Sequence, residues 1–420
     1  MTLARLVPAA LATALCLAAP AAWAQTPLTP APLSPVPPPP LRAGEILRGA
    51  EPERPRGPFN IIPSLTVTGE YNDNIFLNND NKESDFIMSF TPGVALTLER
   101  ENYRLSAGYS FTAAVYADHE EQTRAFERQN FALDAFYQVD PRLSLRLTDY
   151  FAFDTFTNRV SPQGISAGRS TRSYSNVISP GMAWQATPRV TLNADAAYAL
   201  QRYGDTELND SDIYRIGPTV AYAFTPRLSG TAGYTFGYYD IEREAEATTH
   251  APRVGVIYQF TERVTASISG GPIFIDSEDE DRVVGGGTAT LQERFAWGTL
   301  GFLYDRNVGT AGGLGGLTLN DEVGLTVSVT ALMRGLIVTF SPRYTRSQSD
   351  DDAIDVDAFR VSLAATYQLT RWLSAIGGYE FFRQRSDGTL TTISGRDFRA
   401  DADQNRVFFG LQAAYPYPID

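Results

Sequence analysis

The chain has 420 residues, of which 12% are aromatic and only 20% are charged, below the roughly 25% charged residues of ordinary soluble proteins. Its 35 basic and 48 acidic residues give a formal net charge of -13, which disfavours nucleic acid as a partner. One cysteine and two histidines exclude a disulfide framework and a Cys/His zinc module. After the amino-terminal segment, no stretch approaches the roughly 18 unbroken apolar residues of a transmembrane helix.

Residues 1–24 predict a signal peptide. Arg5 supplies a short basic start, residues 6–19 form an apolar stretch, and Ala22-Trp23-Ala24 is an A-x-A cleavage site. The single cysteine, Cys16, lies inside the apolar stretch and would leave with it. We therefore expect an exported mature chain that begins at Gln25.

Residues 25–58 predict a linker. The segment is rich in proline and includes the run Pro37 to Pro40, a composition that favours extended polyproline II and cannot bury a core. We expect it to lie in the periplasm. It is either a spacer or a docking site for a periplasmic partner.

Residues 59–420 predict β-strands, because apolar and polar residues alternate with period two. Leu143, Leu145 and Leu147 share one face, whereas Arg146 and Thr148 share the other. Such segments run for about ten residues or more, whereas strands of soluble sandwiches usually have about five or six. Charges on the polar face suit a wet lumen. The candidate lumen-lining residues are Asp134, Arg146, Asp195, Arg360 and Glu380. Asp149 interrupts the apolar face, and a β-bulge there would explain it.

Repeated turns indicate how these strands connect. The motif of residues 140–144, Asp-Pro-Arg-Leu-Ser, recurs in related form at residues 187–191, 225–229, 261–265 and 370–374. The spacing places two further turns near Gly298 and Arg334, and residues 99–102 supply an earlier copy. Eight tight turns alternating with longer polar loops predict an all-β fold, a transmembrane antiparallel β-barrel of the outer-membrane type. It should have about 18 strands, with 16 as the alternative.

A second repeat lies in the descending strands. Residues 91–93, 179–181 and 217–219 each contain a proline eight or nine residues before a tight turn. Proline removes a hydrogen bond of the β-ladder, so we expect bulges or kinks at these positions.

Acidic residues gather in the long loops. They define a candidate acidic rim that consists of Glu278, Asp279, Glu280, Asp281, Asp350, Asp351 and Asp352. One interpretation is that these charges simply keep the loops soluble. The functional alternatives are that the rim binds divalent cations near lipopolysaccharide, or that it selects cations at the mouth.

The motifs together resemble a known family. Residues 71–76 of the first strand, the Ser-Pro-Gly repeats and the Thr-Pro-Arg-Leu-Ser turns are similar to those of the beta-barrel porin 2 family. The resemblance covers about residues 61–415. It implies an outer-membrane barrel, and some relatives are similar to barrels that accompany exopolysaccharide export.

We predict no enzymatic activity, no cofactor and no metal site. His119 is the one histidine with acidic neighbours, and it lies in a loop rather than in a catalytic constellation. The predicted function is a porin-like channel for small polar solutes, or a barrel linked to polysaccharide export, surrounded by outer-membrane lipid and lipopolysaccharide. The alternative is a non-conducting structural or assembly barrel that recruits a periplasmic partner through its Pro-rich segment.

Overall fold

The computed structural model describes residues 58–161, 164–166, 170–277, 281–349, 354–387, 390–391, 397–398 and 400–419. The predicted signal peptide, and all of the Pro-rich linker except Pro58, lie outside the described residues. The predicted boundaries of these two segments therefore stay predictions.

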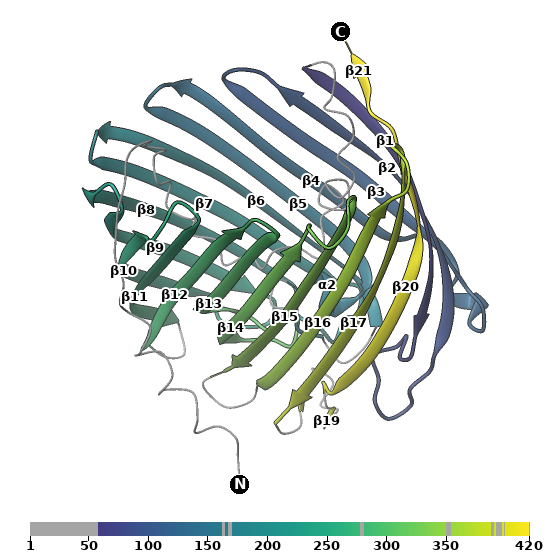
Figure 1. Cartoon of the computed structure of the whole chain (residues 1–420). Coiled ribbons are helices and arrows are strands. Elements are labelled where there is room, and N and C mark those ends of the chain that lie inside the picture. The colour runs from purple at the N-terminus through teal and green to yellow at the C-terminus, as the bar shows by residue number, and fades with distance from the viewer. Residues whose placement is uncertain are drawn as a thin grey trace.

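The described chain forms one closed antiparallel sheet (Figure 1). The first nine strands are β1 (Phe59–Asn72), β2 (Asp85–Glu99), β3 (Tyr103–Tyr116), β4 (Arg124–Asp140), β5 (Leu143–Phe156), β6 (Ser170–Thr187), β7 (Val190–Tyr203), β8 (Ser211–Thr225) and β9 (Leu228–Ile241). The others are β10 (Ala247–Gln259), β11 (Val264–Ser277), β12 (Arg282–Phe295), β13 (Gly298–Thr310), β14 (Leu317–Val329), β15 (Leu336–Gln348), β16 (Asp355–Gln368), β17 (Leu373–Ser386), β20 (Ala402–Ala414) and β21 (Tyr417–Ile419).

The barrel closes between its first and last strands. β1 pairs with β20 from Asn72↔Arg406 to Ser64↔Ala414, and β21 continues along the same neighbour from Ile61↔Tyr417. The sheet has 19 segments, but β20 and β21 are consecutive parts of one strand, so the barrel has 18 strands. The predicted number is confirmed.

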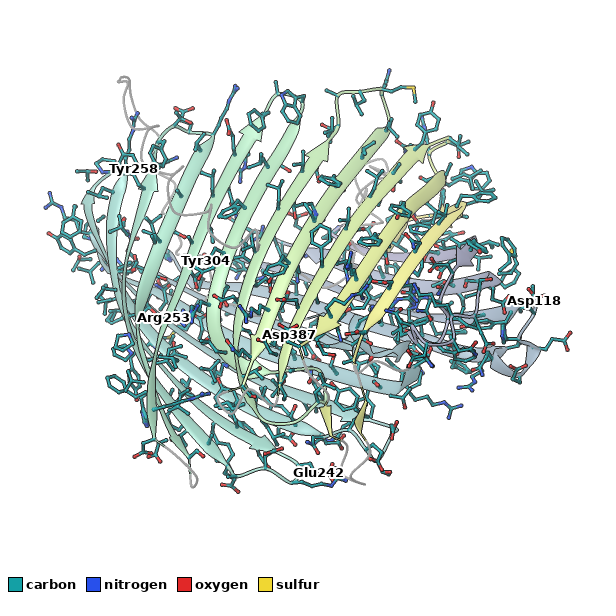
Figure 2. The ribbon with its side chains drawn as sticks, turned by 90° about the horizontal axis from the view of Figure 1, so that it is seen from below. Asp118, Glu242, Arg253, Tyr258, Tyr304 and Asp387 are labelled. Atoms are coloured by element: carbon teal, nitrogen blue, oxygen red, sulfur yellow. The ribbon has the colours of Figure 1, made fainter. Side chains whose placement is uncertain are left out.

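Helical structure is minor among the described residues. A 3-10 helix, η1 (Glu120–Gln122), and one turn of α-helix, α2 (Thr157–Val160), lie in loops, as does a small two-stranded sheet of β18 (Leu390–Thr391) and β19 (Asp397–Phe398). No helix of the described chain has the length and apolar character to cross a membrane. In Figure 2, Glu242 in the long loop between β9 and β10 and Tyr258 beside a tight turn lie toward opposite ends of the barrel.

All eight predicted tight turns occur, and five share one construction. At Thr225, the hydroxyl oxygen accepts hydrogen bonds from the backbone N–H groups of Arg227 at 3.2 Å and Leu228 at 3.0 Å. The same pair of bonds recurs at Asp140, Thr187, Thr261 and Thr370. The side chain thus holds the backbone in the turn, which explains why Asp or Thr begins each copy.

At the proline repeats the prediction of bulges is wrong, whereas the alternative of kinks stays a prediction. Around Pro92, β2 loses two pairs with β3, but Phe90↔Ala113 and Gly93↔Ser110 keep one register. The ladder breaks in the same way near Pro180 and Pro218. Each proline lacks only its own N–H, so the strand loses a bond to one neighbour and stays aligned. The register shifts lie elsewhere, at residues 112–114, 138–140, 154–156, 185–187 and 223–225.

Aromatic residues bound the outer wall at both ends. On β8, Tyr214 and Phe224 both point outward and lie ten residues apart, which is about 33 Å along a strand. At a tilt of about 40° this spans a height of about 25 Å, the thickness of the apolar band on outer-membrane barrels. Near the tight turns the exposed aromatic residues include Phe224, Phe260, Trp297, Trp372, Tyr415 and Tyr417.

Nearer the long loops, tyrosines end the apolar band with a repeated contact. The Tyr198 hydroxyl donates to Asp212 on the next strand at 2.5 Å. The matching pairs are Tyr304–Asp321 at 3.0 Å, Tyr344–Asp357 at 2.5 Å and Tyr379–Asn405 at 2.7 Å. Each tyrosine has an apolar ring and a polar tip, so these pairs suit the boundary between hydrocarbon and lipid headgroups.

Asp149 is explained by a partner rather than by a bulge. Its Oδ1 accepts a hydrogen bond of 2.6 Å from the Asn176 amide on β6, which also donates to the Tyr150 carbonyl. The register of β5 with both neighbours is regular at Asp149, and the shifts lie near its two ends, opposite residues 138–140 of β4 and between Asp154 and Phe156. The carboxylate is therefore hydrogen-bonded on the outer wall.

Candidate functional site in the barrel lumen

Three predicted lumen residues lie together on the inner face of β4 to β7. Arg146 donates to Asp134 on the neighbouring strand at 2.9 Å, and both side chains are close to half exposed. The register places Arg146 and Asp195 on either side of Gly181. A Cβ at Gly181 would meet Asp195 Oδ1 at 2.7 Å, so the glycine provides room for that carboxylate. This part of the wall presents charges of both signs to the lumen.

The other two predicted residues lie on the opposite part of the wall. Glu380 on β17 accepts a hydrogen bond of 2.6 Å from Arg406 on β20. Arg360 on β16 donates at 2.6 Å to the carbonyl of Asn158, which belongs to the loop after β5. One loop can reach β16 from β5 only through the barrel interior, so Arg360 points inward. A polar inner face thus stands behind an apolar outer face. This is the fold of an outer-membrane β-barrel.

The loop between β5 and β6 folds into the lumen, although its sequence indicates an ordinary polar loop. It carries α2 and ends its described part at Ser166. The Ser166 N–H donates to Gln384 Oε1 on β17 at 2.7 Å, and the Gln384 amide donates back to the Ser166 carbonyl at 2.7 Å. Together with the Arg360 contact, these bonds tether the loop to the far wall.

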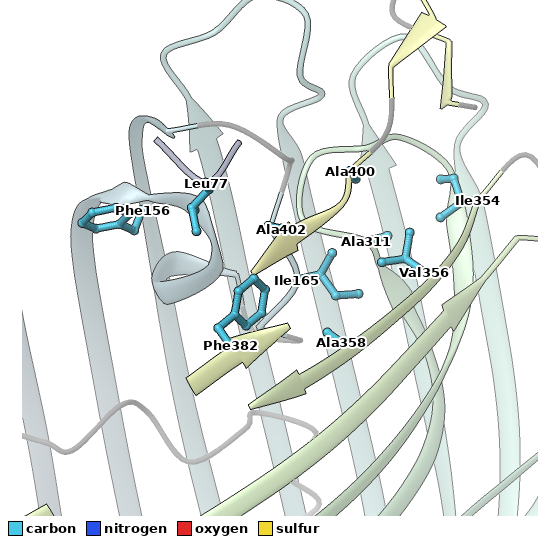
Figure 3. Close-up of a cluster of buried hydrophobic side chains, with 10 residues drawn as sticks. All are labelled: Leu77, Phe156, Ile165, Ala311, Ile354, Val356, Ala358, Phe382, Ala400 and Ala402. Atoms are coloured by element: carbon cyan, nitrogen blue, oxygen red, sulfur yellow. The ribbon is translucent and has the colours of Figure 1, made fainter. Parts of the chain in front are cut away.

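An apolar cluster joins this loop to four others over the mouth (Figure 3). We call this cluster the roof. Its loop residues are Leu77, Ile165, Ala311, Leu314, Ile354 and Ala400, and its wall residues are Phe156, Val356, Ala358, Phe382 and Ala402. Leu77 and Ile165 are fully buried. Because these loops begin on opposite sides of the barrel, their contact covers part of the long-loop mouth with apolar groups.

A chain of alternating charges runs beneath the roof. Asp154 on β5 binds Arg128 on β4 at 3.0 Å and Arg159 of α2 at 3.2 Å. Arg159 lies 3.8 Å from Glu70 on β1, and Glu70 lies 3.5 Å from Arg406. Arg406 then binds Glu380. Three cations alternate with three anions, so the chain is electrically balanced across five strands and the inserted loop.

Side chains of β8 and β9 reach β13 inside the barrel. Arg215 on β8 donates to the Val308 carbonyl on β13 at 2.9 Å, and the Tyr239 hydroxyl donates to the same carbonyl at 3.2 Å. Four strands separate β8 from β13 in the wall, so the contact requires a sharp bend. Buried Ile213, Tyr239, Ala251, Ile273, Ile275 and Val308 fill this corner.

The candidate acidic rim can be placed only in part. Asp281 is exposed in the loop before β12. Glu278, Asp279, Glu280, Asp350, Asp351 and Asp352 lie outside the described residues. Among the residues that the structure does describe, no group of His, Cys, Asp and Glu could hold a metal ion.

No protein-family model matches this sequence, and no curated protein matches it. The resemblance to the beta-barrel porin 2 family therefore stays a prediction. Among solved structures, the chain is similar to the outer-membrane protein OpdK from Pseudomonas aeruginosa, with 10% identity over 84% of this chain and 99% of that one, at a TM-score of 0.41. The chain is also similar to OccAB4 from Acinetobacter baumannii, with 12% identity over 87% of this chain and 100% of that one, at a TM-score of 0.42. A third similar structure is an anion-selective porin from Comamonas acidovorans, with 14% identity over 85% of this chain and 99% of that one, at a TM-score of 0.36.

Sequence patterns miss the residues that shape the lumen most. Asp154, Glu70 and Arg406 have inward positions in their strands, but alternation does not reveal which charges pair. Arg159 lies in a loop that looks solvent-exposed. The one available signal is the apolar pair Phe156 and Ile165, which flank that otherwise polar segment.

Proposed function

We propose that the protein is an outer-membrane channel for small polar solutes. The observation that carries this proposal is the contrast between the two faces of the wall. The outer face is apolar and bounded by aromatic residues at both ends, whereas the inner face carries charges that need water or ionic partners. An 18-strand barrel is wide enough to hold an aqueous path beside the inserted loop.

In this proposal the tight turns and the termini of the mature chain lie in the periplasm, and the long loops lie outside the cell. Short periplasmic turns and longer extracellular loops are the usual arrangement in outer-membrane barrels. The repeated Tyr–Asp contacts at the long-loop end would then meet the lipopolysaccharide leaflet.

The rim would favour cations or neutral polar solutes at low salt. Asp281 is exposed there. The six other acidic residues predicted for the rim belong to the loop between β11 and β12 and the loop between β15 and β16. Added salt would screen these exposed charges and weaken the preference, because the Debye length falls to about 3 Å at 1 M.

Planar bilayers containing the purified protein test the proposal. We expect discrete conductance steps and a reversal potential that indicates cation preference at low ionic strength and little preference at high. Because the roof covers part of the mouth, the same measurement is made on Ile165→Ala. An absence of steps from both proteins would contradict a channel, and an anion preference would show that lumen arginines determine selectivity.

Polysaccharide export and recruitment of a periplasmic partner stay predictions. Residues 25–57 lie outside the described part of the chain, and no described contact favours a polymer over a small solute.

A further inference from the structure

His119 lies between two carboxylates at the long-loop end. Its Nδ1 is 2.8 Å from Asp85 Oδ2, and its Nε2 is 2.7 Å from Glu83 Oε2. Asp85 opens β2, Glu83 belongs to the loop after β1, and His119 belongs to the loop after β3. One imidazole therefore joins two neighbouring loops.

The two carboxylates are held very differently. The Asp85 side chain is fully buried, and its oxygens also accept hydrogen bonds from the backbone N–H groups of residues 117, 118 and 119 at 3.0 to 3.1 Å. The Glu83 side chain is 39% exposed, and its Oε1 accepts a hydrogen bond of 2.8 Å from the amide of exposed Asn81. If one of the two contacts to His119 fails, it is the contact to Glu83.

Both contacts exist together only when the imidazole is protonated. A neutral imidazole has one N–H, so one ring nitrogen would turn a lone pair toward a carboxylate. The hydrogen bonds to Glu83, and then to Asp85, raise the pKa of His119. Other charged groups of the two loops include Asp118, Glu120 and Glu121, which precede or follow His119 in the chain, and Lys82, which precedes Glu83 and lies 3.8 Å from Asp403 on β20. The Phe76 ring meets the imidazole edge-on at 5.7 Å.

The loop that carries Glu83 also carries part of the roof. Leu77, fully buried in the roof, has a positive φ of 54°, a backbone conformation that costs energy for leucine and requires support. On one side that loop is tied to β20, where Asp73 accepts from Asn405 at 2.6 and 2.7 Å. On the other side, the Ile75 N–H donates to the Glu83 carbonyl at 2.9 Å, next to His119.

We propose that His119 is a proton-controlled latch on the mouth of the barrel. Protonated, it binds Glu83 and holds the loop of residues 73–84, with Leu77 seated in the roof. When the rising pH removes one of the two ring protons, His119 keeps its Nδ1–H bond to buried Asp85 and loses Glu83. The loop then loosens on its β3 side, and Leu77 leaves the roof more often. The latch would regulate the proposed channel, closing it in acid and opening it as the pH rises.

Thiol accessibility tests the latch without any need for ion flow. In the full chain with Cys16→Ser, Leu77→Cys introduces a single buried thiol, and Asp80→Cys places one at an exposed position of the same loop as the control. Maleimide reacts with the thiolate, so both labelling rates rise with pH. Dividing the rate of Leu77→Cys by the rate of Asp80→Cys removes this shared effect. We expect this ratio to rise several-fold between pH 5 and about 8, where histidine titrates. In His119→Gln it should be high and independent of pH.

A ratio that stays flat in the chain with His119, or that still rises in His119→Gln, would overturn the proposal. Because Leu77→Cys itself weakens the roof, an NMR titration of the unmodified chain gives a second measurement. The chain has two histidines, so His119→Gln identifies the signal. Glu83→Gln should lower the apparent pKa of His119, and an unchanged pKa would also overturn the latch. If bilayers show no conductance while both measurements succeed, the channel fails and the latch stands.

Discussion

The effect of a single charged residue in the lumen on stability depends on its ionic partners. Asp154 is buried, and it is stabilised by Arg128 and by Arg159 from the inserted loop. A buried charge that loses its partner is costly, of the order of 3–5 kcal/mol, whereas an exposed pair contributes about 0–1 kcal/mol. The balanced chain beneath the roof should therefore determine local stability and local potential more than the exposed Arg146–Asp134 pair does.

Arg159→Gln should move the channel toward stronger cation preference. The change leaves Asp154 and Glu70 with one cation each and adds net negative charge inside the lumen. Reversal potentials under a salt gradient measure the effect. Arg159→Lys keeps the charge and should shift the potential less, and Arg227→Gln at an exposed tight turn should leave it unchanged. A shift toward anions would contradict this assignment.

At the scale of single elements, the strands and turns are determined by residues that are close together in the chain. The side-chain oxygen at the first turn position satisfies two backbone N–H groups, and the alternation of each strand determines which residues meet lipid. Neither feature depends on distant residues, which is why the turn motif and the period-two pattern both reveal structure that the barrel confirms.

Thr225→Ala should lower the free energy of unfolding by about 0.5–1 kcal/mol, the lower range for hydrogen bonds because the turn is exposed. Thr225→Ser keeps the hydroxyl and should lose less. Urea unfolding in detergent, followed by heat-modifiable gel mobility, provides the comparison. Equal losses in both variants would mean that the threonine methyl group, not its oxygen, stabilises the turn.

Leu363→Arg should impair assembly far more than Ser362→Arg. The two residues are adjacent on β16 but face opposite sides, and Leu363 is 42% exposed on the outer wall. A cation facing lipid near the midplane costs about 2–4 kcal/mol, whereas Ser362 lies opposite Glu380, which would attract an arginine. The measurement is the fraction of exported protein that is folded, compared between the two variants. Similar folded fractions would show that β16 has been assigned the wrong outward face.

At the scale of the whole molecule, loops decide whether a wide barrel conducts. The roof brings together five loops that are separated by up to about 320 residues, and it covers part of the mouth with apolar side chains. The wall alone would leave a broad opening. Conductance should therefore depend on roof packing more than on the number of strands.

Leu77→Ala combined with Ile165→Ala should raise the single-channel conductance, because two fully buried roof side chains become too small to hold the loops together. Ile273→Ala provides the matched control. It also truncates a buried apolar residue, at a cost of about 2–5 kcal/mol, but in the corner between β8 and β13. Its conductance should stay near that of the parent. An increase in the control alone would place the restriction in that corner.

The sequence by itself determines the wall. Alternation, strand length and the repeated Asp/Thr turns predict 18 antiparallel strands and their inward positions, because these signals arise between residues that are close in the chain. The lumen is decided by the tertiary structure. Arg159 reaches Glu70, Arg360 reaches Asn158, and Arg215 reaches Val308 only because closure brings distant strands face to face. The roof and the pairing of His119 with Glu83 depend on loop paths, which carry no periodic signal. Such contacts are long-range packing and electrostatics, so no local pattern reveals them.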